Sequence, residues 1–194
     1  MSEFYTYLQL GFGHIADINA FDHIVFIVAL CAVYQLQHLK NIFILVTAFT
    51  IGHSLTLALA TLNIIIIPSQ IIEFLIPVTI FTTCIYNVTS TQSTASKERI
   101  NINYTMALFF GLIHGMGFSN YLRMLLNNKE SIIMPLFSFN IGLEIGQLLI
   151  VGLILGILFV AEKIFKVKHR EWNLFISGAA AGISLILMSE TKFW

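Results

Sequence analysis

The segment Ile132–Ala161, with the sequence IIMPLFSFNIGLEIGQLLIVGLILGILFVA, decides the fold class of this protein. It contains one ionisable residue, Glu144, in an apolar run that exceeds the roughly 20 residues needed to cross the hydrocarbon core of a bilayer. A segment of this composition is typical of a membrane-spanning helix. The sequence therefore predicts an integral membrane protein in contact with the lipid bilayer.

The composition of the whole chain supports this prediction. Of 194 residues, 57% are hydrophobic and 10% are charged, whereas soluble domains have about 45–50% apolar and about 25% charged residues. These values exclude a soluble globular domain, a disordered chain and a coiled coil. The formal net charge of zero gives no electrostatic attraction to nucleic acid, so no nucleic-acid partner is expected. We expect residues 1–194 to form a single transmembrane domain.

Five further segments approach the length that a bilayer requires, which predicts an all-α, polytopic transmembrane helix bundle of about six spans. The expected spans are Phe21–Gln37, Ile42–Leu62, Gln70–Val88, Thr105–Leu126, Ile132–Ala161 and Trp172–Met188. The preceding segment, Ser2–Ala20, is expected to form a short amphipathic or re-entrant helix. The polar segment Thr89–Asn103 is expected to be a flexible cytoplasmic loop.

The distribution of basic residues predicts the orientation, because loops rich in Lys and Arg face the cytoplasm. One side of the predicted bundle carries Lys40, Lys97, Arg99, Lys163, Lys166, Lys168 and Arg170, and the other carries Arg123, Lys129 and Lys192. We therefore expect both termini outside, in a multi-pass protein of a bacterial inner membrane. Residues 1–20 do not have the pattern of a cleavable signal peptide, so the spans themselves are expected to direct insertion.

Small residues in the spans are expected to mediate helix packing. Two pairs of glycines, Gly142 with Gly146 and Gly152 with Gly156, have the spacing that lets helices approach closely in lipid. Packing within the chain is the favoured use, and a homo-oligomer is the alternative. Cys31 and Cys84 lie in apolar segments and are expected to be buried hydrophobic residues.

Ionisable residues within the apolar segments are few, and the predicted topology brings them to the outer half of the membrane. Each would cost at least ~2.5–3.5 kcal/mol at the bilayer centre, so such residues are tolerated where they serve a function. At 1.5 Å per residue, His53 lies roughly 14 Å, and His114 and Glu144 roughly 18 Å, from the outer ends of their spans. The remaining members lie near the outer ends of their spans or just before the first span: His14, Asp17, Asp22, His23 and Glu73. This convergence predicts one shared site.

Several histidines and carboxylates in an apolar pocket are typical of a site for a divalent transition metal, such as zinc, nickel or cobalt. One or two ions are expected. Asn140, Glu144 and Gln147 form a polar stripe at helical spacing, and Glu144 is a candidate general base. Glu73 stays open between a ligand, a neighbour of a ligand and a helix N-terminal charge. His38 and His169 lie beside basic residues and are expected to face solvent or lipid headgroups.

Four segments resemble the HupE/UreJ family of small membrane proteins. They are GHIADINAFDHIVFIVAL at Gly13–Leu30, FTIGHSLTLALA at Phe49–Ala60, FGLIHGMGFS at Phe110–Ser119 and FNIGLEIGQL at Phe139–Leu148. Ala20 stands where the family usually has glycine, a small change that should not remove a ligand. Carried over by motif, the resemblance implies the functional residues His14, Asp17, Asp22, His23, His53, His114 and Glu144. It also implies nickel or cobalt uptake, the activity commonly associated with the family.

Three functions stay open from the sequence. The first is a carrier that takes up a divalent metal ion from outside. The second is an intramembrane metal-dependent hydrolase, in which a metal-activated water attacks a lipid or another membrane-embedded substrate. The third is a metal sensor or assembly factor. The carrier is favoured because of the family resemblance, whereas the one-sided position of the polar residues favours the hydrolase.

Overall fold

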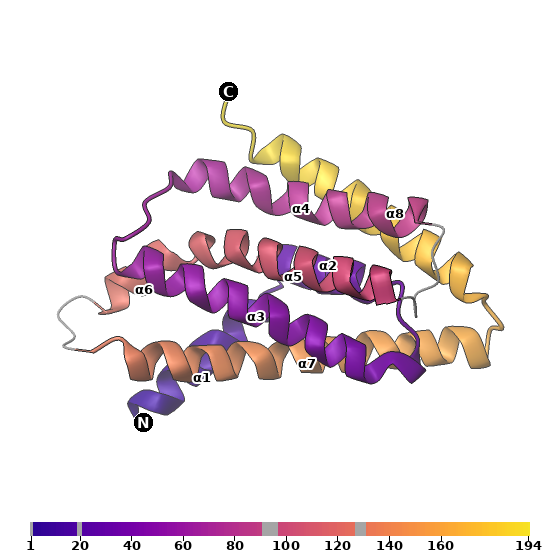
Figure 1. Cartoon of the computed structure of the whole chain (residues 1–194), viewed down its shortest axis with the longest axis horizontal. Helices are drawn as coiled ribbons and strands as arrows, with labels where there is room; N and C mark the ends of the chain where they lie inside the picture. Colours follow the sequence, from indigo (N-terminus) through magenta and orange to yellow (C-terminus); the bar gives the residue numbers. More distant parts are fainter. Residues whose placement is uncertain (1, 19–20, 91–96, 127–130) are drawn as a thin grey trace.

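The computed structural model describes residues 2–18, 21–90, 97–126 and 131–194, and within these ranges its regular structure is helical throughout (Figure 1). The predicted all-α class is therefore confirmed. The elements are α1 (Glu3–Ile15), α2 (Asp22–Cys31), η1 (a 3₁₀ turn, Leu36–His38), α3 (Leu39–Thr61), α4 (Ser69–Thr89), α5 (Lys97–Gly117), α6 (Ser119–Leu126), α7 (Ile133–Lys163) and α8 (His169–Glu190).

The long helices lie side by side along the long axis of the molecule (Figure 1). Helices α4 and α8 form one side, α2, α3 and α5 lie in the middle, and α7 forms the other side with α1 crossing it. The most extensive pairings join α3 to α5, α1 to α7 and α4 to α8. The short helix α1 is thereby held against α7, and the short helix α2 contacts α4, α7 and α8.

Four helical segments of the described chain are long and apolar enough to cross a membrane. They are Leu36–Thr61, Ser69–Thr89, Ile133–Lys163 and His169–Glu190. They correspond to the expected second, third, fifth and sixth spans. Each of these four helices therefore supports the prediction of a membrane protein. The total of six spans and the side of the membrane that the termini occupy stay predictions.

The first expected span is shorter than predicted. Helix α2 ends at Cys31 instead of continuing to Gln37, which leaves a helix of 10 residues. The apolar residues that follow, Ala32, Val33 and Tyr34, are almost fully buried in the protein. Non-helical backbone at membrane depth is tolerated where protein covers it. The apolar run therefore reflects burial by neighbouring helices and not a continuous span.

The fourth expected span is two helices, and the loop before it is partly helical. Helix α5 already begins at Lys97, within the segment expected to be a loop, and ends at Gly117, so only 91–96 of that segment lie outside the described residues. Buried Asn103 donates a hydrogen bond to the Tyr34 hydroxyl at 2.8 Å, which explains how a polar residue is accommodated in the helix. After the break, Arg123 of α6 donates to the Ala60 carbonyl at 2.6 Å, near the C-terminus of α3.

The glycine pairs of α7 have different surroundings. A Cβ atom at Gly142 would collide with the Leu8 carbonyl of α1, and one at Gly146 would collide with the Ile15 side chain, so this pair packs within the chain as favoured. Gly152 and Gly156 have open space at the Cβ position. A homo-oligomer stays a prediction. Cys31 and Cys84 are both buried free cysteines, as expected.

Candidate metal centre

Four different helices bring one histidine each to a common point. His14 lies in the last turn of α1, His23 is the second residue of α2, His53 lies within α3 and His114 lies in the last turn of α5. His53, His114 and His23 have exposed fractions of 0%, 1% and 5%, whereas His14 is half-buried. A site of this kind requires the helices to converge closely.

Glycines allow this close approach between α3 and α5. A Cβ atom at Gly115 would collide with the backbone carbonyl of His53 and with the Thr56 hydroxyl. One at Gly111 would collide with the Phe49 carbonyl, and one at Gly52 with the Leu108 carbonyl. Because only hydrogen atoms occupy these positions, the two backbones come close enough to place His53 and His114 in one neighbourhood.

A second close approach sets the position of His14. A Cβ atom at Gly11 of α1 would collide with the Phe139 carbonyl of α7, and Gly142 is in contact with the Leu8 carbonyl in the same way. Helix α1 is therefore held against α7 one turn before His14. The two glycine contacts bring a short N-terminal helix to the α3/α5 pair.

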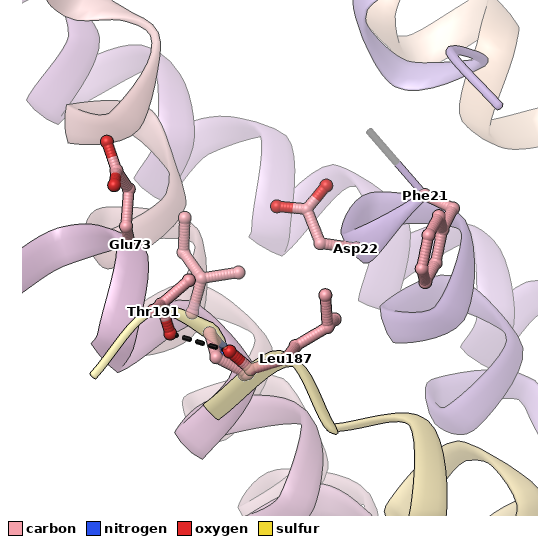
Figure 2. A pocket seen from close by; sticks show the side chains of 7 residues that line it. Phe21, Asp22, Glu73, Leu187 and Thr191 are labelled. Atoms are coloured by element: carbon pink, nitrogen blue, oxygen red, sulfur yellow. Dashed lines mark hydrogen bonds between the residues drawn. The ribbon is translucent and has the colours of Figure 1, made fainter. Parts of the chain in front are cut away.

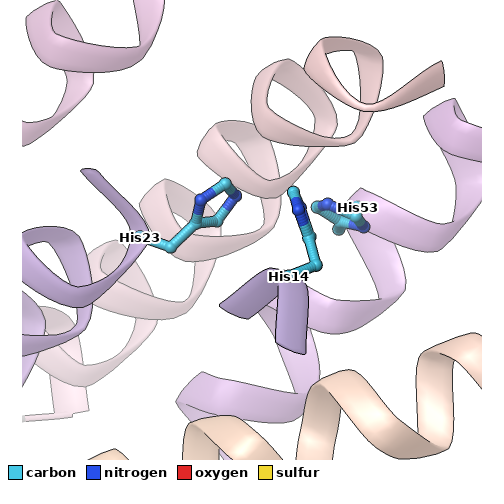
Figure 3. Close-up of side chains that lie close together, drawn as sticks. All are labelled: His14, His23 and His53. Atoms are coloured by element: carbon cyan, nitrogen blue, oxygen red, sulfur yellow. The ribbon is translucent and has the colours of Figure 1, made fainter. Parts of the chain in front are cut away.

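His14, His23 and His53 form the tightest group (Figure 3). Each offers one nitrogen, and these three atoms lie within 4.8 Å of one another. The ring centroid of His23 lies 4.6 Å from that of His14 and 5.2 Å from that of His114. His23 therefore lies next to both His14 and the fourth histidine, His114. Below, "the histidine group" means His14, His23 and His53. His114 is a neighbour of this group and not a member.

Several imidazole nitrogens at this point are buried and have no hydrogen-bond partner within the described residues. They are His14 Nε2, His23 Nε2, His53 Nδ1, His53 Nε2 and His114 Nε2. A buried polar atom left without a partner costs about 1–3 kcal/mol. A neutral imidazole offers one lone pair, so a metal ion that accepts it would remove this cost for one nitrogen of each ring, and the donor set fits a transition-metal ion.

The outer contacts of two rings orient them for binding. The Nδ1 of His114 donates to the Phe110 carbonyl at 2.8 Å, which leaves its Nε2 free as an electron-pair donor. The Nδ1 of His23 lies 3.1 Å from a carboxylate oxygen of Asp22, whose same oxygen accepts from the His23 backbone N–H at 2.9 Å. Metal-binding histidines commonly use one ring nitrogen in this way, which fixes the tautomer and ring orientation.

Aromatic side chains enclose the histidines. The Phe118 ring lies 4.1 Å from His14 and the Phe26 ring lies 4.9 Å from His114, both measured between ring centroids. Phe139 stacks with His53 at 6.4 Å. These rings exclude water and lower the local polarity, which strengthens any bond between an ion and the imidazoles.

The predicted acidic residues occupy different places. Asp22 contacts His23 directly, and Asp17 is exposed beside His14. Glu144 accepts a hydrogen bond from Thr47 at 2.9 Å and is not part of the histidine group. Thr47 precedes His53 by six residues, or about 9 Å along α3. The structure therefore brings Asp22 to the histidines and places Glu144 along α3 from them.

Glu73 lies across a pocket from Asp22 (Figure 2). This pocket, of about 170 Å³, lies between α2, α4 and the C-terminal end of α8. Its remaining lining residues are Phe21, Ile76, Pro77, Leu187 and Thr191. Glu73 is exposed and is not part of the histidine group, so its role stays open.

The polar stripe of α7 pairs with hydroxyl groups that sequence reasoning missed. Thr50 donates to the Gln147 side chain at 2.7 Å, in addition to the bond from Thr47 to Glu144. Thr47 and Thr50 are spaced i, i+3 on α3, as are Glu144 and Gln147 on α7, a signal that could have predicted the pairing. Asn140 Oδ1, the third member of the stripe, has no partner among the described residues.

His169 is partly exposed and also has two partners within the protein that the sequence did not predict. Its Nδ1 lies 3.1 Å from a Glu162 carboxylate oxygen, and its Nε2 lies 3.0 Å from the Val33 carbonyl. It thus connects the chain after α2 to the junction of α7 and α8. His38, which is also partly exposed, accepts a hydrogen bond from the Gln35 backbone N–H at 3.2 Å through Nδ1.

Comparison with known proteins agrees with the four histidine- and acid-bearing motifs. The family model described as HupE / UreJ protein matches residues 1–192. The chain belongs to the HupE/UreJ family. No curated protein and no solved structure matches it. Membership therefore confirms the resemblance on which the expectation of metal handling rested.

Proposed function

We propose that this HupE/UreJ protein takes up a divalent transition-metal ion, with nickel or cobalt as the preferred cargo. The observation that carries the proposal is the histidine group: three nitrogens from three helices within 4.8 Å of one another. Neutral imidazole is a ligand that suits nickel, cobalt and zinc. The family's association with nickel and cobalt uptake supports the first two.

The surroundings of the histidine group favour a cargo ion. Ionisable residues between apolar helices mark ion pathways in membrane proteins, because the cost of placing them there has to be offset by function. The Asp22 carboxylate beside His23 supplies a negative charge that compensates part of the ion's charge. His114 adds a further imidazole next to His23, so an ion has a neighbouring ligand toward which it can move.

The hydrolase alternative gains no support from the position of Glu144. A general base must come within hydrogen-bond reach of the water that it deprotonates, about 2.6–3.2 Å or one intervening water. The Glu144 carboxylate instead accepts from Thr47 and lies outside the histidine group. We therefore retain uptake as the proposed function.

Metal uptake into proteoliposomes tests the proposal. Protein reconstituted into vesicles is expected to accumulate radioactive nickel or cobalt, and His53→Ala is expected to abolish accumulation and weaken binding by more than about 100-fold, because loss of a ligand exceeds the effect of losing an outer contact. His38→Asn is the matched control, since His38 lies outside the histidine group. Equal uptake by vesicles with wild-type protein, His53→Ala protein or no protein would contradict the proposal.

A further inference from the structure

We infer that the cargo ion reaches the histidine group through a pocket between α1 and α6, with Asp17 at its rim and His14 as the ligand that hands the ion inward. This inference rests on the proposed function. It assigns Asp17 and Gly13 a role in ion entry and not in final binding. The pocket, called the α1/α6 pocket below, is defined by the residues that line it: Gln9, Leu10, Gly13, His14, Asp17, Phe118 and Tyr121.

The α1/α6 pocket is open at the protein surface and borders a second cavity. Its volume is about 300 Å³, ample for an ion that still carries several water molecules. A second cavity of about 400 Å³ shares Gln9, Leu10 and Tyr121 with it and continues along the same two helices. An ion therefore has a broad approach to this side of the molecule.

His14 belongs both to the α1/α6 pocket and to the histidine group. It is also the most exposed of the four histidines, since His23, His53 and His114 are at most 5% exposed. Its Nε2 is nevertheless buried and has no hydrogen-bond partner among the described residues. His14 thus has a ring edge at the pocket and an electron-pair donor on the inside.

The order of ligands along this route follows the chemistry of dehydration. The exposed Asp17 carboxylate attracts a hydrated cation, and the polar residues Gln9 and Tyr121 line the same pocket. Imidazole then replaces oxygen ligands at His14, where Phe118 lies 4.1 Å from the ring and excludes solvent. A nickel or cobalt ion gains from this exchange because it binds nitrogen well.

The pocket beside Asp22 and Glu73 is the competing route, and its lining is less suited to entry. No histidine lines it, and the Asp22 oxygen Oδ1 is already held by both the ring and the backbone of His23. It is also smaller, at about 170 Å³. An ion entering there would meet mostly apolar side chains and no imidazole among the lining residues.

Gly13 offers a direct test because it lines the α1/α6 pocket and a Cβ atom there would meet nothing within 4 Å. Leucine is accommodated in the helix and fills the pocket without altering a proposed ligand. Gly152→Leu is the matched control, since that glycine also has open space and lines neither pocket. The readout is the rate at which cobalt(II) binds purified protein, followed by stopped-flow absorption.

We expect Gly13→Leu to slow both association and dissociation by about 10-fold or more and to leave the equilibrium Kd within about 3-fold of wild type, because a blocked route changes both rates alike. Gly152→Leu is expected to match wild type. Asp17→Asn is expected to slow association only, most strongly at low ionic strength, because steering by a charge is screened by salt.

Unchanged rates in Gly13→Leu would overturn the inference, and slowing by Leu187→Trp alone would assign entry to the pocket beside Glu73. If Gly13→Leu does not fold, a Gly13→Cys variant modified with a thiol reagent replaces it, because Cys31 and Cys84 are buried and the wild type controls for their reaction. Absence of cobalt binding by the wild type would refute the proposed function itself. If the wild type binds cobalt and the Gly13 variants bind and release it at wild-type rates, only the proposed entry route is refuted.

Discussion

A single hydrogen bond decides which atom of His114 can bind an ion. The Nδ1 of His114 contacts the Phe110 carbonyl oxygen, which can only accept a hydrogen bond. The ring proton is therefore on Nδ1, and Nε2 keeps the lone pair that an ion can accept. The Asp22 carboxylate contacts Nδ1 of His23 and so leaves that ring's Nε2 for the ion. The sequence could predict which residue types gather here, but not the atom that each presents, because ring orientation depends on contacts between residues distant in the chain.

Asp22, which contacts His23, and Glu144, which lies along α3 from the histidine group, are expected to respond differently to removal of their charge. Asp22→Asn is expected to lower metal affinity by about 10–100-fold, because it weakens the contact that orients His23. Glu144→Gln keeps an acceptor for the Thr47 hydroxyl and is expected to leave affinity unchanged. Equilibrium titration with nickel or cobalt measures both. Equal losses in the two variants would contradict this division.

At the scale of helices, the close α3/α5 approach is the feature that holds the site together. Gly115→Ala is expected to lower the free energy of unfolding by about 1–3 kcal/mol, because the added methyl group meets the His53 backbone carbonyl, which cannot move aside as the Thr56 side chain can. The same variant should weaken metal binding, since α3 must shift and carry His53 with it.

Gly178→Ala is the control for that prediction. Gly178 lies on α8, where a Cβ atom would meet nothing within 4 Å. Alanine is favoured over glycine in a helix by about 1 kcal/mol, so this variant should be as stable as wild type or more stable. Thermal unfolding in one detergent compares the three proteins. A Gly115→Ala protein as stable as the control would show that the approach is looser than described.

The sequence predicted helices better than it predicted where they end. The expected spans Gln70–Val88 and Ile132–Ala161 match α4 and α7 to within two residues at each end. Hydropathy failed after α2 because it does not distinguish exposed side chains from those covered by other helices, and it failed at the α5/α6 break because a break in the helix leaves the apolar run uninterrupted. The contacts of His169 could not be predicted, because its partners, Glu162 and Val33, come together only in the folded bundle.

At the scale of the whole molecule, the orientation in the membrane follows from the seven-to-three distribution of basic residues between the two sides. Because that bias places Lys163–Arg170 in the cytoplasm, both termini are expected outside. A reporter that is active only in the cytoplasm should give no signal when fused after Trp194. The same reporter inserted between α7 and α8 should be active. Strong activity of the fusion after Trp194 would reverse the orientation, and with it the side from which the ion enters.

The central claim is that imidazoles of the histidine group bind the ion, and X-ray absorption spectroscopy of cobalt-loaded protein tests it most directly. The account predicts at least three nitrogen ligands at about 2.0–2.1 Å with the outer-shell scattering of imidazole rings, and loss of one ring in His53→Ala. A first shell made only of oxygen atoms, or a spectrum unchanged by His53→Ala, would contradict it.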